Sequence, residues 1–252
     1  MHNRFYIEEK IESLAGSQIV LESLAGHVKA FRKKTGDEIK LYDGSGNVLS
    51  AKIVKISKKN VGVELLSKET HSGNNTKIFL FLPLITSHIM DQLIARICEM
   101  EVSGIFPVIT ERSINLKNEK EINFKLSKWD KISKGAMVLA GKNFSTVINR
   151  PVVLPDAFKM TENFNSKLIA SPSASLFLKD FLLAFDFNVK NISISIFIGP
   201  EGGFSAFEIN LSKEYGFTPV KLSNNIMSTF VSSIYLVSNL VNFAFSVSDY
   251  AS

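Results

Sequence analysis

The stretch from Ile198 to Glu208, Ile-Gly-Pro-Glu-Gly-Gly-Phe-Ser-Ala-Phe-Glu, constrains the fold more than any other part of the sequence. It overlaps a β-branched run at 192–198, which is typical of a buried strand. Ser205 and Glu208 then form the Ser-x-x-Glu pattern of a capping box, which predicts that a helix begins near Ser205. The glycines therefore form a strand-to-helix turn, and open α/β sheets bind cofactors at such turns.

The residues of this turn indicate the kind of ligand. Gly199, Gly202 and Gly203 lack Cβ atoms, so a ligand can lie against the bare backbone. Glu201 would repel a pyrophosphate, and the spacing matches neither the Walker loop nor the dinucleotide fingerprint. A carboxylate suits a cationic or hydroxyl-bearing ligand, and S-adenosylmethionine (SAM) is both. The alternative is a tight turn that needs glycine for its geometry alone.

Composition is that of a globular protein. The chain has 252 residues, of which 45% are hydrophobic and 21% charged, enough for one large domain or two modest ones. Its single cysteine, Cys98, excludes an internal disulfide framework, and no Cys/His cluster has metal-ligand spacing, so we expect no metal. The charged amino terminus lacks a signal-peptide core, and the apolar stretch 231–247 favours a buried helix over a membrane span. We expect a cytoplasmic protein without a membrane partner.

The net charge of +5 permits a polyanionic partner but does not establish one. Residues 1–72 carry a small surplus of positive charge, which is concentrated in the cluster 29–34. Contact with a phosphate backbone and a merely solvated face explain this cluster equally well.

The residue pattern divides the chain into two regions. Up to about residue 72 it predicts short strands at 37–42, 48–56 and 61–66, the first two joined by a hairpin turn. Several short strands with glycine turns favour a small β-barrel. The polar segment 71–76 is a plausible link between domains.

Beyond this link, strands and helices alternate, which predicts an α/β domain with a mostly parallel sheet covered by helices. The expected strands are 77–83, 104–109, 167–170 and 192–198, with 151–154 extended, and the expected helices are 89–102, 125–140, one from Ser205 and one from Thr229.

Taken together, the residues resemble a known family. Gly199-Pro-Glu-Gly-Gly-Phe-Ser205 with Glu208 resembles the signature of the SPOUT-class ribosomal RNA small subunit methyltransferase E family, which modifies N3 of a uridine in 16S rRNA. The resemblance covers nearly the whole chain. Further matches are Arg4-Phe-Tyr, His27, Phe31-Arg32, Gly36-Asp37, Asp43-Gly, Glu99, Val102, Pro107, Glu111-Arg112-Ser113, Trp129, Ile132, Ala136, Gly141, Pro151, Leu222, Ile226 and Thr229.

The resemblance implies a PUA-like β-barrel over 1–72 that binds RNA and an α/β SPOUT domain with a trefoil knot over 73–252. It also implies SAM as cofactor, a homodimer, and small-subunit rRNA or the assembled 30S particle as partner. The cofactor-binding positions would be Ile198, Gly199, Glu201, Gly202, Gly203, Leu222, Ile226, Met227 and Thr229, and the RNA-binding positions Arg4, Arg32, Lys33 and Lys34.

The sequence departs from the family pattern around the expected site. Asn225 and Ser228 stand where the family has arginines, and Phe230 stands where it has a glutamate. Arg112, Lys142 or a residue of the partner subunit would then have to supply the positive charge at the substrate. We therefore weigh an active uridine-N3 methyltransferase against a catalytically impaired relative that binds RNA or the ribosome, and against an enzyme with a different target.

Overall fold

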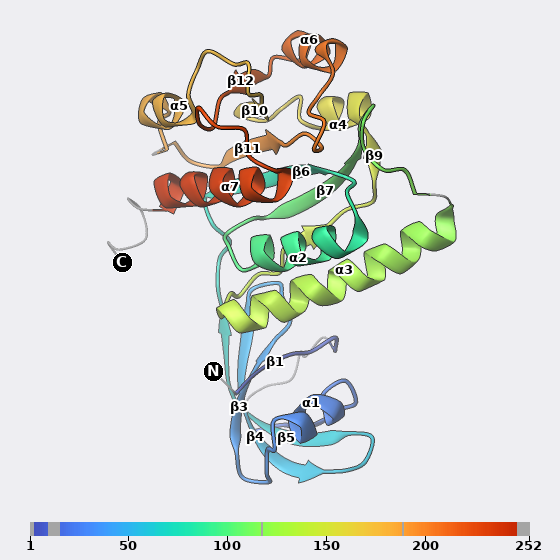
Figure 1. Ribbon diagram of the computed structural model, residues 1–252. Helices are drawn as coiled ribbons and strands as arrows, with labels where there is room; N and C mark the ends of the chain where they lie inside the picture. The colour runs from blue at the N-terminus through green and yellow to red at the C-terminus, as the bar shows by residue number, and fades with distance from the viewer. Residues whose placement is uncertain (1–2, 10–15, 117, 188, 246–252) are drawn as a thin grey trace. The chain divides into compact units, whose positions relative to one another are not determined.

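The computed structural model describes residues 3–9, 16–116, 118–187 and 189–245 (Figure 1). The chain folds into two compact units. Residues 1–73 and 134–145 make up the first unit, and residues 74–133 and 146–252 the second.

Within the described residues, the first unit holds a five-stranded sheet with the order β1-β3-β4-β5-β2. β1 pairs in parallel with β3, and the other pairings are antiparallel. The expected hairpin is confirmed, because β3 and β4 pair across a turn in which Asp43 accepts the Ser45 and Asn47 amide N–H groups. The elements are β1 (Arg4–Tyr6), β2 (Gln18–Leu21), α1 (Ala25–Ala30), β3 (Glu38–Tyr42), β4 (Asn47–Ile56) and β5 (Val61–Thr70).

The first unit also includes the end of the long helix α3 (Glu119–Ala140) and the loop that follows it. Met137 is fully buried against Tyr42 and Val48. Residues 134–145 therefore pack with the amino-terminal strands, although a division of the sequence at residue 72 separates them. Their contacts are distant in sequence, which explains why a local pattern does not indicate them.

The second unit contains a parallel sheet of seven strands among the described residues, in the order β12-β10-β11-β6-β7-β8, with β9 also paired to β7. Every pairing in it is parallel, which confirms the expected α/β class. The strands are β6 (Thr76–Pro83), β7 (Gly104–Ile109), β8 (Val147–Ile148), β9 (Val152–Val153), β10 (Ser166–Ala170), β11 (Ile192–Phe197) and β12 (Thr218–Val220).

Helices cover both faces of this sheet. Figure 1 shows α2 and α7 side by side along one face, with α4 and α6 on the other. Beneath α4 and α6 lies an aromatic cluster in which the rings of Phe81 and Phe197 stack with centroids 4.1 Å apart. The helices are α2 (Ser87–Cys98), α4 (Leu154–Met160), α5 (Leu178–Ala184), α6 (Ala206–Glu214) and α7 (Thr229–Phe245).

Several boundaries differ from the sequence-based expectations. α2 ends at Cys98 rather than at residue 102, because the chain turns there and the Val102 N–H donates to the Met100 carbonyl. The extended stretch expected at 151–154 is confirmed by β9 at Val152–Val153. The sequence-based expectations do not include α4, which begins at Leu154 and has Pro155 in its first turn, where proline suits a helix. Cys98 is buried, as its apolar surroundings predicted. Across the described residues, no helix is long and apolar enough to cross a membrane.

Candidate functional site

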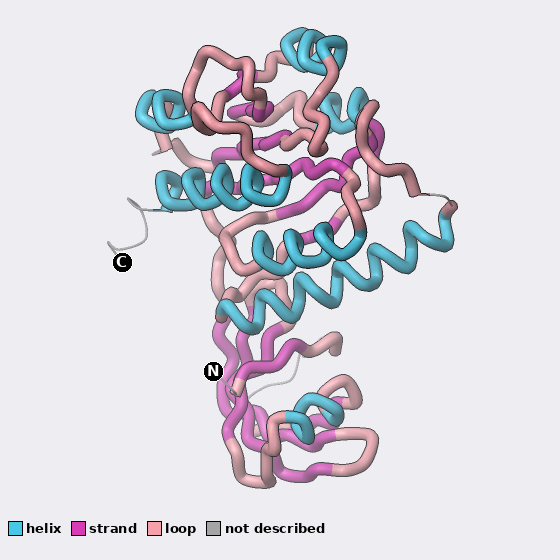
Figure 2. Tube along the Cα trace, viewed as in Figure 1, coloured by secondary structure: helices cyan, strands magenta, loops and turns pink. Residues whose placement is uncertain are grey.

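A pocket lies where three parallel strands end. β12, β10 and β11 are neighbours with parallel register, so their carboxyl ends meet at one edge of the sheet. The chain leaves each strand through an irregular connection, drawn as loop in Figure 2. These connections enclose a cavity of about 230 Å³. Its wall consists of Ala170, Ser171, Pro172, Ile198, Gly199, Pro200, Glu201, Gly202, Gly203, Leu222, Ser223, Asn225, Ile226, Met227, Thr229 and Ser232.

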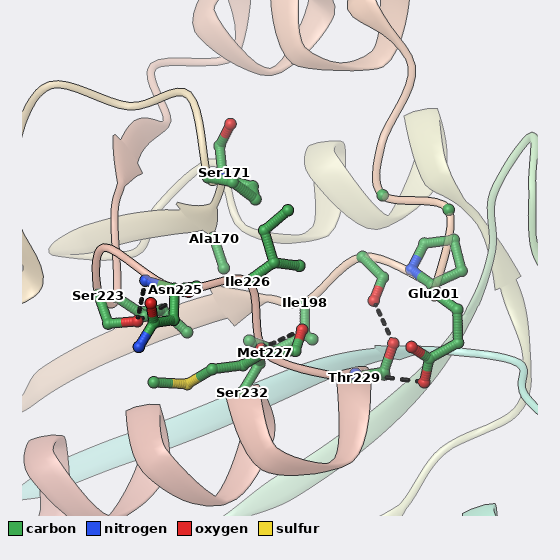
Figure 3. Close-up of a pocket in the computed structure, with 16 residues that line it drawn as sticks. Ala170, Ser171, Ile198, Glu201, Ser223, Asn225, Ile226, Met227, Thr229 and Ser232 are labelled. Atoms are coloured by element: carbon green, nitrogen blue, oxygen red, sulfur yellow. Dashed lines mark hydrogen bonds between the residues drawn. The ribbon is translucent and has the colours of Figure 1, made fainter.

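Every residue that the sequence suggested for cofactor binding lies on this wall. Figure 3 shows Glu201 and Thr229 at one end of the pocket, and Ser223 and Asn225 at the other. Sequence reasoning missed the loop after β10, which contributes Ser171 and Pro172. That loop carries no glycine motif, and only the parallel register of β10 beside β11 would have indicated it.

A backbone hydrogen bond and a positive φ angle define the shape of the glycine turn. The Gly203 N–H donates to the Pro200 carbonyl at 2.8 Å, and Gly203 has a φ of +67°, which favours glycine. A Cβ on Gly199 would come within 3.1 Å of the Phe204 ring and 3.3 Å of the Gly203 Cα. The geometry of the turn therefore favours glycine at both positions, at Gly203 through its φ and at Gly199 through close packing.

Thr229, the first residue of α7, ties the turn to this helix. Its hydroxyl donates to the Gly199 carbonyl at 2.9 Å, and its N–H donates to a Glu201 carboxylate oxygen at 3.3 Å. The Thr229 side chain is buried, whereas Glu201 is exposed. A carboxylate is stabilised at a helix N-terminus, so Glu201 is held at the pocket with its negative charge.

The loop after β12 forms the opposite wall. The Ser223 hydroxyl donates to the Asn225 carbonyl and accepts the Asn225 N–H, which closes a tight local turn. Ile226 then projects from the loop and is 86% exposed, while Met227 is partly buried. The pocket thus combines apolar side chains with one carboxylate.

A second set of bonds joins the glycine turn to the end of β7. The predicted capping box is present, with the Ser205 hydroxyl accepting the Glu208 N–H and a Glu208 oxygen accepting the Ser205 N–H. The other Glu208 oxygen accepts the Glu111 N–H at 2.8 Å, and Glu208 is only 5% exposed. The next residue, Arg112, donates from Nη1 to the Gly202 carbonyl at 2.7 Å. A guanidinium is therefore held against the wall of the pocket.

The remaining candidates belong to the first unit. Lys142 is buried there, immediately after the end of α3. Arg4 lies on β1 with its guanidinium against Gly141. Lys33 donates from Nζ to the Asn3 side-chain oxygen, and Arg32 and Lys34 are exposed. Their roles in catalysis and RNA binding stay predictions.

In the part of the chain that the structure describes, no three His, Cys, Asp or Glu side chains form a group that could hold a metal ion. The pocket offers backbone amides, hydroxyls and the Glu201 carboxylate, and the Arg112 guanidinium is bonded to its wall at Gly202. A loop cradle at the carboxyl edge of a parallel sheet is the usual place for a nucleotide-type cofactor in α/β proteins.

Comparison with known protein families shows which family the chain belongs to. Residues 72–241 match the family described as RNA methyltransferase domain, and residues 25–66 match RNA methyltransferase PUA domain. The first match covers most of the chain, so the protein belongs to the RNA methyltransferase family.

Two relatives of similar length carry the same name. The chain is 25% identical to ribosomal RNA small subunit methyltransferase E of Mesomycoplasma hyopneumoniae, over 94% of this chain and 98% of that protein. The protein of the same name from Aquifex aeolicus is 26% identical, over 95% and 99%. Among solved structures, a Legionella pneumophila protein described as a methyltransferase with bound cofactor SAM superposes with a TM-score of 0.84, at 27% identity, covering 94% of this chain and 96% of that one.

Proposed function

We propose that this protein transfers the methyl group of SAM to N3 of a uridine in small-subunit ribosomal RNA. The observation that carries the proposal is the pocket itself, because every residue suggested for cofactor binding lines one cavity at the carboxyl edge of the sheet. The shared name of the relatives supports rRNA as the substrate, and the resemblance to the family supports uridine N3 as the acceptor atom.

The residues present fit SAM. Ile198, Leu222 and Met227 offer apolar surface to an adenine ring. The Glu201 carboxylate, held by the Thr229 N–H, attracts positive charge and accepts bonds from hydroxyl groups. When bound, SAM supplies an electrophilic methyl group on a positively charged sulfur.

The acceptor nitrogen has to be prepared by the protein. Uridine N3 carries a proton and has no useful lone pair in the neutral imide. For methylation this proton would pass to solvent, N3 would accept the methyl group, and the former sulfonium would leave as a neutral thioether. The negative charge of the deprotonated imide would spread onto the uracil oxygens before transfer. A fixed cation beside the base lowers the effective pKa of the imide.

Arg112 is the candidate for this cation. Its Nη1 donates to the Gly202 carbonyl, which holds the guanidinium at the turn that forms the pocket wall. A guanidinium has five N–H donors, so one bond to the turn leaves others for a base oxygen. Arg112 would compensate for Asn225 and Ser228, which stand where the family has arginines.

The wider arrangement follows the family resemblance. We propose that residues 1–72 form a PUA-like barrel that contacts RNA through Arg4, Arg32, Lys33 and Lys34, and that residues 73–252 form a SPOUT domain with a trefoil knot, in a cytoplasmic protein. The same resemblance implies a homodimer.

The test is transfer of labelled methyl groups. Small-subunit particles that lack the modification are incubated with the protein and methyl-labelled SAM, and the RNA is digested to nucleosides for mass spectrometry. We expect labelled 3-methyluridine in near-stoichiometric yield. Folded protein that binds the particle but transfers no label would contradict the proposal and favour a non-enzymatic RNA-binding role.

A further inference from the structure

A second cavity, of about 450 Å³, lies directly beside the proposed cofactor pocket. The two cavities meet at five residues that line both of them, namely Ala170, Ser171, Pro172, Gly202 and Gly203. Methyl transfer requires donor and acceptor atoms about 3–3.5 Å apart, so an acceptor site must adjoin the cofactor pocket in this way.

The walls of the second cavity have the chemistry of a nucleobase site. Phe204, Ile209 and Pro172 supply an aromatic ring and apolar surface, on which a splayed-out base can stack. Ser173 and Asn210 supply a hydroxyl and an amide at the same cavity. The amide N–H of Asn210 can donate to a uracil oxygen, which leaves N3 open to the methyl donor.

Hydrogen bonds also connect the helix that lines the second cavity to the loop that carries Arg112, the candidate cation. Ala206, Ile209 and Asn210 lie on α6, and the capping residue Glu208 on this helix accepts the Glu111 N–H. The neighbouring Arg112 donates to the carbonyl of Gly202, which lines both cavities. One buried carboxylate therefore positions α6 and the turn that carries Arg112 relative to each other.

We propose that this second cavity holds the acceptor base, a uracil extruded from the RNA. Its face stacks on Phe204, its N3 points toward the residues that line both cavities, and the Asn210 amide N–H donates to a uracil oxygen. The inference rests on the proposed function and deepens it by assigning the substrate site. Enzymes that modify a base take it out of the stack into such a pocket. The rival occupant is the amino-acid tail of SAM, since the two cavities share lining residues.

The test fills the second cavity and leaves the first unchanged. Ala206→Leu replaces a methyl group by an isobutyl group at a position that lines only the second cavity, and Phe207→Leu is its matched control. Phe207 lies next to Ala206 in the first turn of α6, is 71% exposed and lines neither cavity. We expect Ala206→Leu to lower kcat/KM for RNA about 100-fold by displacing the base. SAM affinity by calorimetry should be unchanged, and the control should behave like wild type in both assays.

A second, less disruptive variant tests the site in case Ala206→Leu does not fold. Asn210→Ala creates space rather than filling it, and loss of one hydrogen bond should lower kcat/KM for RNA about three- to tenfold at unchanged SAM affinity. Unchanged RNA turnover in both variants would overturn the acceptor site alone, and so would a loss of SAM affinity that equals the loss of turnover. Inactive wild-type protein would overturn the proposed function and this inference together. Wild-type methylation of another base, abolished by Ala206→Leu, would overturn only the uridine assignment.

Discussion

Replacement of Gly203 by valine tests the glycine turn through backbone strain. Gly203 has a φ of +67°, and no heavy atom lies within 4 Å of a Cβ added there. A valine would thus meet no atom of the protein at its Cβ, and the cost comes from holding a β-branched residue in the left-handed region. That cost is about 1–3 kcal/mol.

The strain converts into a loss of SAM affinity. If the strained turn relaxes, the fraction of molecules with the binding-competent conformation falls, and the apparent affinity falls with it. At about 1.4 kcal/mol for each factor of ten, SAM should bind about 5- to 150-fold more weakly to Gly203→Val. Isothermal titration calorimetry measures the affinity, and circular dichroism with urea checks that the fold is kept.

Gly203→Asn separates strain from obstruction. Asparagine is close to valine in size but tolerates the left-handed region, so its affinity should stay near that of wild type. Wild-type affinity in Gly203→Val would refute the assignment of the pocket. An equal loss in both variants would show that side-chain volume, not backbone strain, blocks the ligand.

Three further predictions follow from the contacts around the pocket and from the first unit. Arg112→Met should lower kcat/KM for RNA about tenfold or more at unchanged SAM affinity, because it removes charge beside the acceptor; an unchanged rate would exclude Arg112 as the cation. Glu208→Ala removes two hydrogen bonds to a buried carboxylate and should lower the free energy of unfolding by about 3 kcal/mol in urea titration, whereas a loss under 1 kcal/mol would contradict the capping account. At Asp43, partial burial raises the pKa, but hydrogen bonds from Asn47 and Ser45 outweigh it and hold the pKa below its ordinary 3.8. The ionised Asp43 carboxylate therefore stabilises the fold fully at pH values above 3.8, and this stabilisation is lost as the pH falls through the lower pKa that Asp43 has in the folded state. We expect Asp43→Asn to be less stable than wild type at pH 6 and to lose less stability on acidification.

The sequence predicts those parts of the site whose structure depends on residues close together in the chain. Glycine spacing and the Ser205–Glu208 pair depend on neighbouring residues, so the strand, turn and helix around them follow from the sequence and are present in the structure. Ser171 and Ser223 reach the pocket only because β10 and β12 pair in parallel register, and no local motif encodes this pairing.

Contacts between residues far apart in the sequence were not predicted either, because no local motif encodes them. The bond from the Glu111 N–H to Glu208 joins residues 97 positions apart, so the capping box predicted the helix start but not the attachment of Arg112. Likewise, Met137 packs on Tyr42 and Val48, which no pattern within α3 indicates. Sequence thus predicted the elements around the glycine turn and residues that line the pocket, while the neighbours of each loop required the fold.

Co-crystallisation with SAM tests the central claim most directly. The account predicts density for the ligand in the cavity between the three loops, with the adenine against Ile198, Leu222 and Met227 and the Glu201 carboxylate beside its polar part. The methyl group should face the second cavity across Gly202 and Gly203. Density for SAM elsewhere on the protein, or an empty cavity at saturating ligand in crystals whose lattice leaves it open, would contradict the account.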